Sequence, residues 1–129
     1  MRTQIIGISG SPIQNSNTDR LIQAVLKATG LSAEFIKLSK TRIGPCIACL
    51  GCKKDNICKV EDDFPAIAEK VLNAGALVVG GYSPYGGVDG FTKAFLERLF
   101  SLRHQNGLNR GKLAVVVATG IGRGTPGLN

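Results

Sequence analysis

The sequence has few aromatic residues and no long apolar run. It contains no tryptophan, two tyrosines and five phenylalanines, which leaves little surface for stacking on nucleic-acid bases. The longest apolar runs, such as residues 113–118, are far shorter than the roughly 20 residues that a membrane helix needs. Helix-turn-helix and zinc-finger patterns are also absent from the sequence. We therefore expect neither a nucleic-acid partner nor a membrane-embedded segment.

Acidic residues are scarce as well. Nine Asp and Glu stand against 16 Lys and Arg, so the formal net charge is +7. Such a charge keeps a protein in solution, or it attracts an anionic ligand or an acidic protein partner. Residues 1–12 lack the apolar core and cleavage site of a secretory signal, which predicts a cytoplasmic protein. The sequence has no internal repeat, and its length suits a single domain spanning residues 1–129.

Apolar runs that resemble strands alternate with helical patterns, which is typical of a parallel α/β sheet. The expected strands are residues 3–9, 33–39, 76–83 and 112–119. Three of them are almost wholly apolar, as expected when helices cover both faces, whereas the second carries Glu34 and Lys37 and is typical of an edge. This pattern predicts a flavodoxin-like doubly wound sheet in the order 2-1-3-4. We expect the fifth strand that usually follows to be absent from residues 1–129.

Ligands of such sheets bind beyond the carboxyl ends of the strands, where three loops are informative. Loop 9–19 supplies hydroxyl groups and backbone N–H groups at the start of a helix, which suits a phosphate, although an ordinary capped turn would look similar. It contains neither a G-x-G-x-x-G pattern nor a P-loop lysine, so it fits the monophosphate of FMN better than a triphosphate. Loop 82–91 has Pro and Gly residues that allow close approach to a flat ligand. Glycine-rich loop 119–127 lies on the same side, and we include Gly120 among the cofactor-binding residues.

All the cysteines of the chain lie within one segment, residues 46–58. They are Cys46, Cys49, Cys52 and Cys58, with the spacing C-x2-C-x2-C-x5-C. In a reducing cytosol such a set more often binds metal or performs redox chemistry than forms disulfides. The first three match the opening of a bacterial ferredoxin cluster motif. Structural zinc sites usually use two separate C-x2-C pairs, which here overlap at Cys49. An iron–sulfur cluster, a zinc ion and unligated thiols are the three alternatives.

Three motifs together resemble the iron–sulfur flavoproteins, which belong to the NAD(P)H-dependent FMN reductase group. The motifs are residues 7–18, 46–64 and 80–99. The resemblance implies that the FMN phosphate is held by Ser9, Ser11, Ser16, Asn17 and Thr18, and that the isoalloxazine is lined by Pro84, Tyr85, Gly86 and Gly87. It also implies that Cys46, Cys49, Cys52 and Cys58 hold a [4Fe–4S] cluster. One departure is Ile13, where the family commonly has an arginine.

The same resemblance implies an electron-transfer oxidoreductase. Electrons would pass between a ferredoxin-like or NAD(P)H donor and an acceptor through the cluster and FMN, and the protein would be a homo-oligomer. Two other functions remain open. One is an NAD(P)H-dependent FMN or quinone reductase without a cluster, and the other is a non-enzymatic binding module stabilised by zinc.

Overall fold

The computed structural model describes residues 4–120. Its four parallel strands form a single sheet in the order β2-β1-β3-β4, so the predicted flavodoxin-like order is confirmed. The strands are β1 (Ile5–Ser9), β2 (Ala33–Lys37), β3 (Ala76–Tyr82) and β4 (Leu113–Thr119). The helices are α1 (Asn17–Ala28), α2 (Phe64–Asn73) and α3 (Gly90–Arg98), with the short 3-10 helices η1 (Leu38–Lys40) and η2 (Leu99–Leu102).

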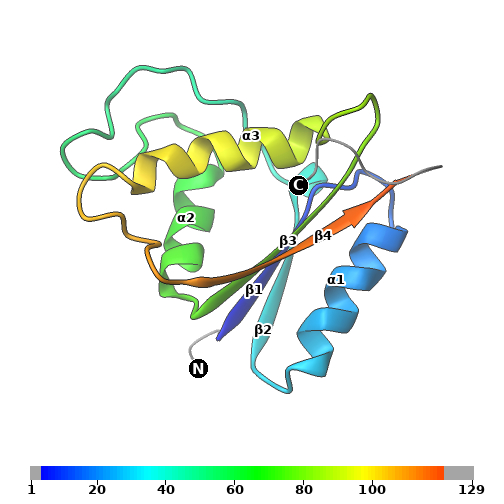
Figure 1. The fold of residues 1–129 in the computed structure, drawn as a ribbon. Coiled ribbons are helices and arrows are strands. Elements are labelled where there is room, and N and C mark those ends of the chain that lie inside the picture. The colour runs from blue at the N-terminus through cyan, green and yellow to red at the C-terminus, as the bar shows by residue number, and fades with distance from the viewer. Residues whose placement is uncertain (1–3, 121–129) are drawn as a thin grey trace.

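Helices cover both faces of the sheet, with α1 on one side and α2 and α3 on the other (Figure 1). Successive side chains of a strand point to opposite faces, and the apolar residues of β1 separate accordingly. Ile5 packs in a cluster with Ile22 of α1, whereas Ile6 and Ile8 join a larger cluster that includes Phe64 and Phe95. Two hydrophobic layers therefore enclose the central strands β1 and β3.

Side-chain caps set the starts of α1 and α3 next to the carboxyl ends of the strands. Ser16 caps α1, and its hydroxyl accepts a hydrogen bond from the Asp19 N–H at 3.1 Å. Asp89 caps α3 in the same way, through the Thr92 N–H at 2.9 Å. The chain leaves α1 at Gly30, whose φ of +67° is favourable for glycine. Two helix N-termini thus face the end of the sheet where ligands of this fold bind.

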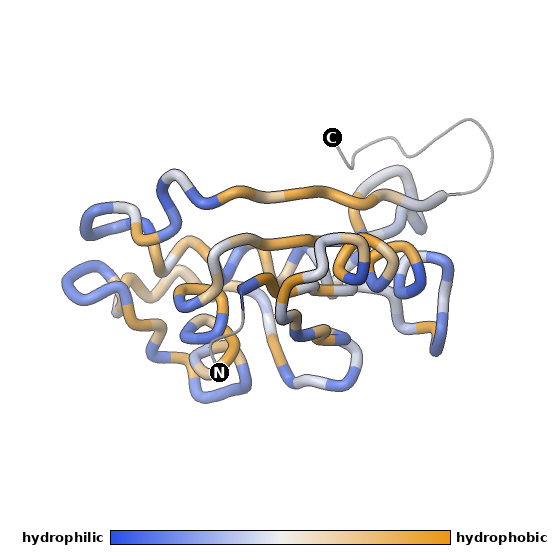
Figure 2. The backbone as a smooth tube through the Cα atoms, turned by 90° about the horizontal axis from the view of Figure 1, so that it is seen from below, coloured by the Kyte–Doolittle hydropathy of each residue, from blue (hydrophilic) through white to orange (hydrophobic). Residues whose placement is uncertain are grey.

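Strand β4 is much more exposed than its apolar sequence predicts. The expectation of burial on both faces is wrong in the described part of the chain, because Leu113, Val115 and Val116 are 75%, 47% and 69% exposed. Figure 2 shows this strand as an apolar run along the border of the molecule. It pairs with β3 on one side, and no other strand among residues 4–120 pairs with its outer edge. Within the same residues, each helix is too short or too polar to cross a bilayer.

Candidate functional site

A cleft of about 720 Å³ opens at the carboxyl ends of β1, β3 and β4. This volume lies in the range of small-molecule and cofactor sites. Its lining comprises Ser11, Pro12, Ile13, Asn15, Ser16, Asn17, Thr18, Tyr82, Ser83, Pro84, Thr119 and Gly120. The structure therefore brings together six of the residues that the sequence singled out for a cofactor, from three separate loops. They are Ser11, Ser16, Asn17, Thr18, Pro84 and Gly120.

Thr119 is a cleft residue that the sequence analysis missed. It is the last residue of β4, and its hydroxyl lies 2.7 Å from that of Thr18 at the start of α1. The contact joins two segments 101 residues apart and closes one wall of the cleft. The position of Thr119 at the carboxyl end of a strand is the sequence feature that could have identified it as a cleft residue. The glycine-rich loop that follows lies outside the described residues from position 121 onward.

Ser9 lies beneath the cleft rather than in its wall. Its side chain is fully buried, and its hydroxyl donates to the Asp19 Oδ1 at 2.5 Å. The Ser9 oxygen also accepts the Ser11 N–H at 3.3 Å. Ser9 thus supports the loop from below, and a direct contact with a phosphate stays a prediction.

Lys37 is a second residue that sequence reasoning missed, because Glu34 and Lys37 indicated only a solvent-exposed edge. Its side chain is 9% exposed, and its Nζ lies 2.5 Å from the Asp19 Oδ2 and 2.7 Å from the Ile13 carbonyl oxygen. Burial raises the pKa of Asp19, but the hydrogen bonds from Lys37 and Ser9 outweigh it, so the pKa lies below 3.8. This buried ion pair holds the loop in place from the edge of the sheet.

The loop after β3 is less complete as a binding surface. Pro84 lines the cleft, whereas Tyr85 is 98% exposed and neither Gly86 nor Gly87 is among the lining residues. Gly86 has a φ of +71°, a left-handed conformation that favours glycine. Roles for Tyr85, Gly86 and Gly87 against a flat ligand stay predictions, since this loop would have to fold over the bound molecule.

The four cysteines line a single small cavity together with Arg98, Phe100 and apolar side chains of the loop. None of them is in a disulfide: Cys46 and Cys49 are exposed, Cys58 is half-buried and Cys52 is buried. Burial raises the pKa of the Cys52 thiol above 9.0, and the three neighbouring cysteines raise it further. The sequence cluster of thiols is therefore also a cluster in space.

The loop that carries these thiols has an unusual backbone. Ala48 and Leu50 have φ values of 56° and 60°, a left-handed conformation that is costly for residues with a Cβ. In this arrangement the Ala48 N–H points to the Cys46 Sγ at 3.4 Å. Such strain is typical of functional loops, where a specific geometry is maintained at the expense of stability.

A metal group has to match this donor set in size as well as in chemistry. Among residues 4–120, no three Cys, His, Asp or Glu side chains are arranged to hold one metal ion. A tetrahedral zinc site with Zn–S bonds of about 2.3 Å requires sulfur atoms about 3.8 Å apart. A cube of iron and sulfide is larger and takes four thiolates around it. The thiols fit that group in number and type, but the cavity holds only about 20 Å³, so the exposed loop would have to move outward.

Arg98, at the end of α3, joins the cysteine loop to the helix layer. It forms two hydrogen bonds to the Asp62 carboxylate, at 2.5 and 3.0 Å, and its side chain is 1% exposed. Burial raises the pKa of Asp62, but the hydrogen bond from Arg98 is among the causes that bring it below 3.8. For Arg98, burial lowers the pKa, and the bonds to Asp62 and Cys58 raise it above its ordinary value. Both groups are charged in the folded protein.

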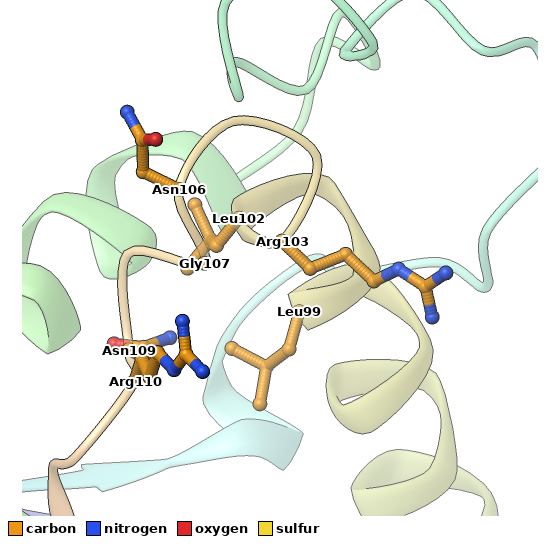
Figure 3. Close-up of a pocket in the computed structure, with 7 residues that line it drawn as sticks. All are labelled: Leu99, Leu102, Arg103, Asn106, Gly107, Asn109 and Arg110. Atoms are coloured by element: carbon orange, nitrogen blue, oxygen red, sulfur yellow. The ribbon is translucent and has the colours of Figure 1, made fainter.

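A separate cavity of about 450 Å³ lies between η2 and the segment that leads into β4 (Figure 3). Leu99, Arg103 and Arg110 are among its lining residues. Figure 3 shows Arg110 near Leu99, whereas the Arg103 side chain extends away from the cavity. The Arg103 guanidinium stacks on Phe100, with its Cζ 4.8 Å from the ring centre. This cavity lies at the amino end of β4, opposite to the end where ligands of parallel sheets bind.

The sheet order and the hydroxyl-lined cleft at its carboxyl end define a flavodoxin-like protein. Comparison with known families gives the particular group. The family model of NADPH-dependent FMN reductase matches residues 3–127, so the chain belongs to that family.

Similar curated proteins carry the name iron-sulfur flavoprotein. The chain is 36% identical to one from Methanocaldococcus jannaschii over 123 residues, which is 93% of this chain and 63% of the relative. It is 30% identical to one from Methanosarcina thermophila, covering 93% of this chain and 64% of the relative. The chain therefore spans about three fifths of the length of these relatives.

Solved structures show the same fold. An NADH:FMN oxidoreductase in its apo form has a TM-score of 0.62 and 24% identity, covering 94% of this chain and 60% of the other. A structure of RosB with a bound riboflavin-phosphate derivative has a TM-score of 0.74 and 18% identity, with coverages of 95% and 54%. At these identities the likeness concerns the fold alone.

Proposed function

We propose that the protein is an FMN-dependent electron-transfer oxidoreductase that carries a [4Fe–4S] cluster. The observation that supports this proposal most strongly is the presence of two sites in one chain. One is the cleft at the carboxyl ends of the strands, and the other is the cavity lined by all four cysteines. Membership of the FMN reductase family supports the flavin, and the names of the curated relatives support the cluster.

The residues that would hold the FMN phosphate lie at the N-terminus of α1. The hydroxyls of Ser11, Ser16 and Thr18 and the Asn17 side chain would donate hydrogen bonds to it, and the positive end of the helix dipole would favour its charge. Family members commonly have an arginine at the position of Ile13. In this chain the nearby cation Lys37 is paired with Asp19.

When bound, FMN supplies one- or two-electron chemistry and the cluster supplies one-electron chemistry. Helix α3 lies between the two candidate sites along the chain. The first residues of this helix follow the loop after β3, and its last residue, Arg98, contacts Cys58. Glu97 of the same helix accepts the Cys46 N–H at 3.3 Å. This helix gives the two sites a common, rigid support (Figure 1).

A second candidate is an NAD(P)H-dependent FMN or quinone reductase without a cluster. The small cysteine cavity favours it, because about 20 Å³ is roughly the space of one water molecule. In that case the chain retains the cysteine loop, but its four thiols bind no metal.

Anaerobic purification with an absorption spectrum and iron, sulfide, zinc and flavin analysis separates the candidates. The proposal expects a brown protein with broad absorbance, FMN, and about four iron atoms per chain. A yellow protein without iron would support the cluster-free reductase. A colourless protein with one zinc per chain would instead indicate a zinc-stabilised binding module.

Replacement of Ser11 by alanine tests the phosphate site. Ser11 lines the cleft, and its hydroxyl accepts only a long bond of 3.3 Å from the Ile13 N–H. We expect FMN binding to weaken by about 1–3 kcal/mol, the range for a lost hydrogen bond to a charged group. Isothermal titration calorimetry measures the change. Ser32→Ala, at the opposite end of the sheet beside Gln4, is the matched control and should leave the affinity unchanged.

The donor is a ferredoxin-like protein or NAD(P)H. Lys53 and Lys54 are exposed in the cysteine loop and would attract an acidic donor. Electron transfer from ferredoxin should therefore slow as salt rises, and the salt dependence should be weaker in Lys53→Gln/Lys54→Gln. Stopped-flow kinetics provide the rates, with Lys27→Gln on the exposed side of α1 as the control. A flat response to salt in the unaltered protein would contradict electrostatic steering.

The protein is a homo-oligomer in this proposal, and β4 provides the contact. An apolar edge strand with exposed side chains favours pairing with another copy. We expect light scattering on the 129-residue chain to give a mass above that of a 13.6 kDa monomer. Val116→Lys, on a 69% exposed side chain, should shift the distribution toward the monomer. A stable monomer of the unaltered chain at micromolar concentration would refute the contact.

A further inference from the structure

The cavity between η2 and the segment that leads into β4 has walls that the fold holds in place. The Leu108 N–H donates to the Leu102 carbonyl oxygen at 2.9 Å, which ties the segment to η2. The Lys112 Nζ donates to the Ala74 carbonyl oxygen at 2.7 Å, which ties it to the end of α2. The volume of about 450 Å³ lies in the range of small-molecule sites. A ligand that enters such a preformed cavity loses little free energy to ordering the protein.

The charge of this cavity is positive, because its lining contains two arginines and no acidic residue. Arg110 is exposed, lies near Leu99 (Figure 3) and forms no ion pair within the part of the chain that the structure describes. Arg103 instead extends away from the cavity and stacks on Phe100. One guanidinium is therefore available to a ligand. It matches one carboxylate, which a guanidinium binds through two parallel N–H···O bonds.

The other lining residues favour a ligand with an apolar body. Leu99 and Leu102 contribute apolar side chains from η2. Asn109 contributes a carboxamide whose Oδ1 is buried without a hydrogen-bond partner among the described residues. Because this oxygen has no bond to lose, the carboxamide can turn and present its N–H groups to an anion. One cation, one amide and an apolar surface suit a small aromatic carboxylate, whereas the nearly two charges of a phosphate monoester would require a second cation.

We propose that this cavity is a second ligand site, which binds a small aromatic carboxylate through Arg110 and the apolar surface of Leu99 and Leu102. It is separate from the cleft proposed for FMN, because the two lie at opposite ends of β4. Seven strand residues with a rise of about 3.3 Å each place the two sites about 20 Å apart. The bound carboxylate would not touch a flavin in the cleft, so the proposal goes beyond the proposed function and does not depend on it.

Titration of the isotope-labelled 129-residue chain with 2-naphthoate, followed by NMR, tests the proposal. We expect the amide signals of residues 99–110 to shift and to saturate at one probe per chain. Arg110→Met should weaken binding about tenfold or more, because it removes the charge-assisted contact. The neutral probe 2-naphthalenemethanol has the same rings without the charge and should bind about tenfold more weakly. Arg103→Met is the matched control and should change the affinity less than about threefold, since its side chain extends away from the cavity.

Two results would overturn the proposal: no shifts in residues 99–110 at millimolar probe, or equal affinity in Arg110→Met and the unaltered chain. A repeat of the titration with saturating FMN separates this site from the cleft. The probe should bind with unchanged affinity, whereas its displacement by FMN would place it in the cleft and refute the second site. A chain that binds 2-naphthoate as expected but fails to bind FMN would refute the proposed function and support the carboxylate site.

Discussion

Replacement of Lys37 by methionine is expected to lower the free energy of unfolding by about 3–5 kcal/mol. The Asp19 side chain is 4% exposed, and without Lys37 its charge would be buried with only the hydroxyl of Ser9 and the backbone around Ser16 as partners. Burial of an uncompensated charge costs far more than a surface ion pair contributes. Urea denaturation followed by circular dichroism measures the loss.

Two controls make this result specific. The double variant Lys37→Met/Asp19→Asn removes both charges and should recover most of the stability. Lys70→Met breaks the ion pair between Lys70 and Glu34, whose two side chains are 49% and 35% exposed, respectively. This substitution should lower the free energy of unfolding by less than about 1 kcal/mol. Equal losses in Lys37→Met and Lys70→Met would contradict the assignment of Lys37 as a buried, structurally essential cation.

The buried pair of Lys37 and Asp19 makes the stability of the fold sensitive to acid. The pKa of Asp19 lies below 3.8 in the folded protein, and that of Asp62 is lowered as well. A carboxyl group with a lowered pKa contributes stability above its unfolded pKa of about 3.9, and this contribution is lost as the pH falls through the folded pKa. The free energy of unfolding should therefore decline below about pH 4, and decline less in Lys37→Met/Asp19→Asn.

Replacement of Gly10 by alanine is the second change with a large expected effect. An added Cβ would lie 1.7 Å from the Thr92 Oγ1 and 2.6 Å from the Asp89 Oδ2. Both groups are buried, and Asp89 also accepts the Tyr82 N–H at 3.1 Å. The clash displaces the cap of α3 and the start of the loop after β3 together.

We expect Gly10→Ala to lower the free energy of unfolding by about 3 kcal/mol or more, which is the upper end of the usual range for overpacking. We also expect the variant to bind FMN more weakly. Thermal denaturation and calorimetric FMN titration measure the two effects. Gly90→Ala is the matched control at the start of α3, because a Cβ there meets nothing within 4 Å. Unchanged stability of Gly10→Ala would mean that the loop after β1 does not pack against α3 in solution.

The features that the sequence determined by itself are those with short-range causes. Short, almost wholly apolar runs predict the strands, and Glu34 and Lys37 correctly placed β2 at an edge. Ser16 at the start of α1 and Gly30 at its end are capping signals that act over a few residues. The gathering of four thiols within residues 46–58 also needs no tertiary information, since the chain between them is short.

The features that only the tertiary structure decided join residues that are distant along the chain. Lys37 reaches Asp19 across 18 positions, Arg98 reaches Cys58 across 40, and Thr119 meets Thr18 across 101. Spacing patterns carry no record of such pairs, because a long side chain at a strand or helix end can turn to solvent or to a buried partner with equal local preference. The exposure of Val116 in β4 has the same origin. An apolar sequence favours burial, but burial requires a neighbouring element on that side of the strand.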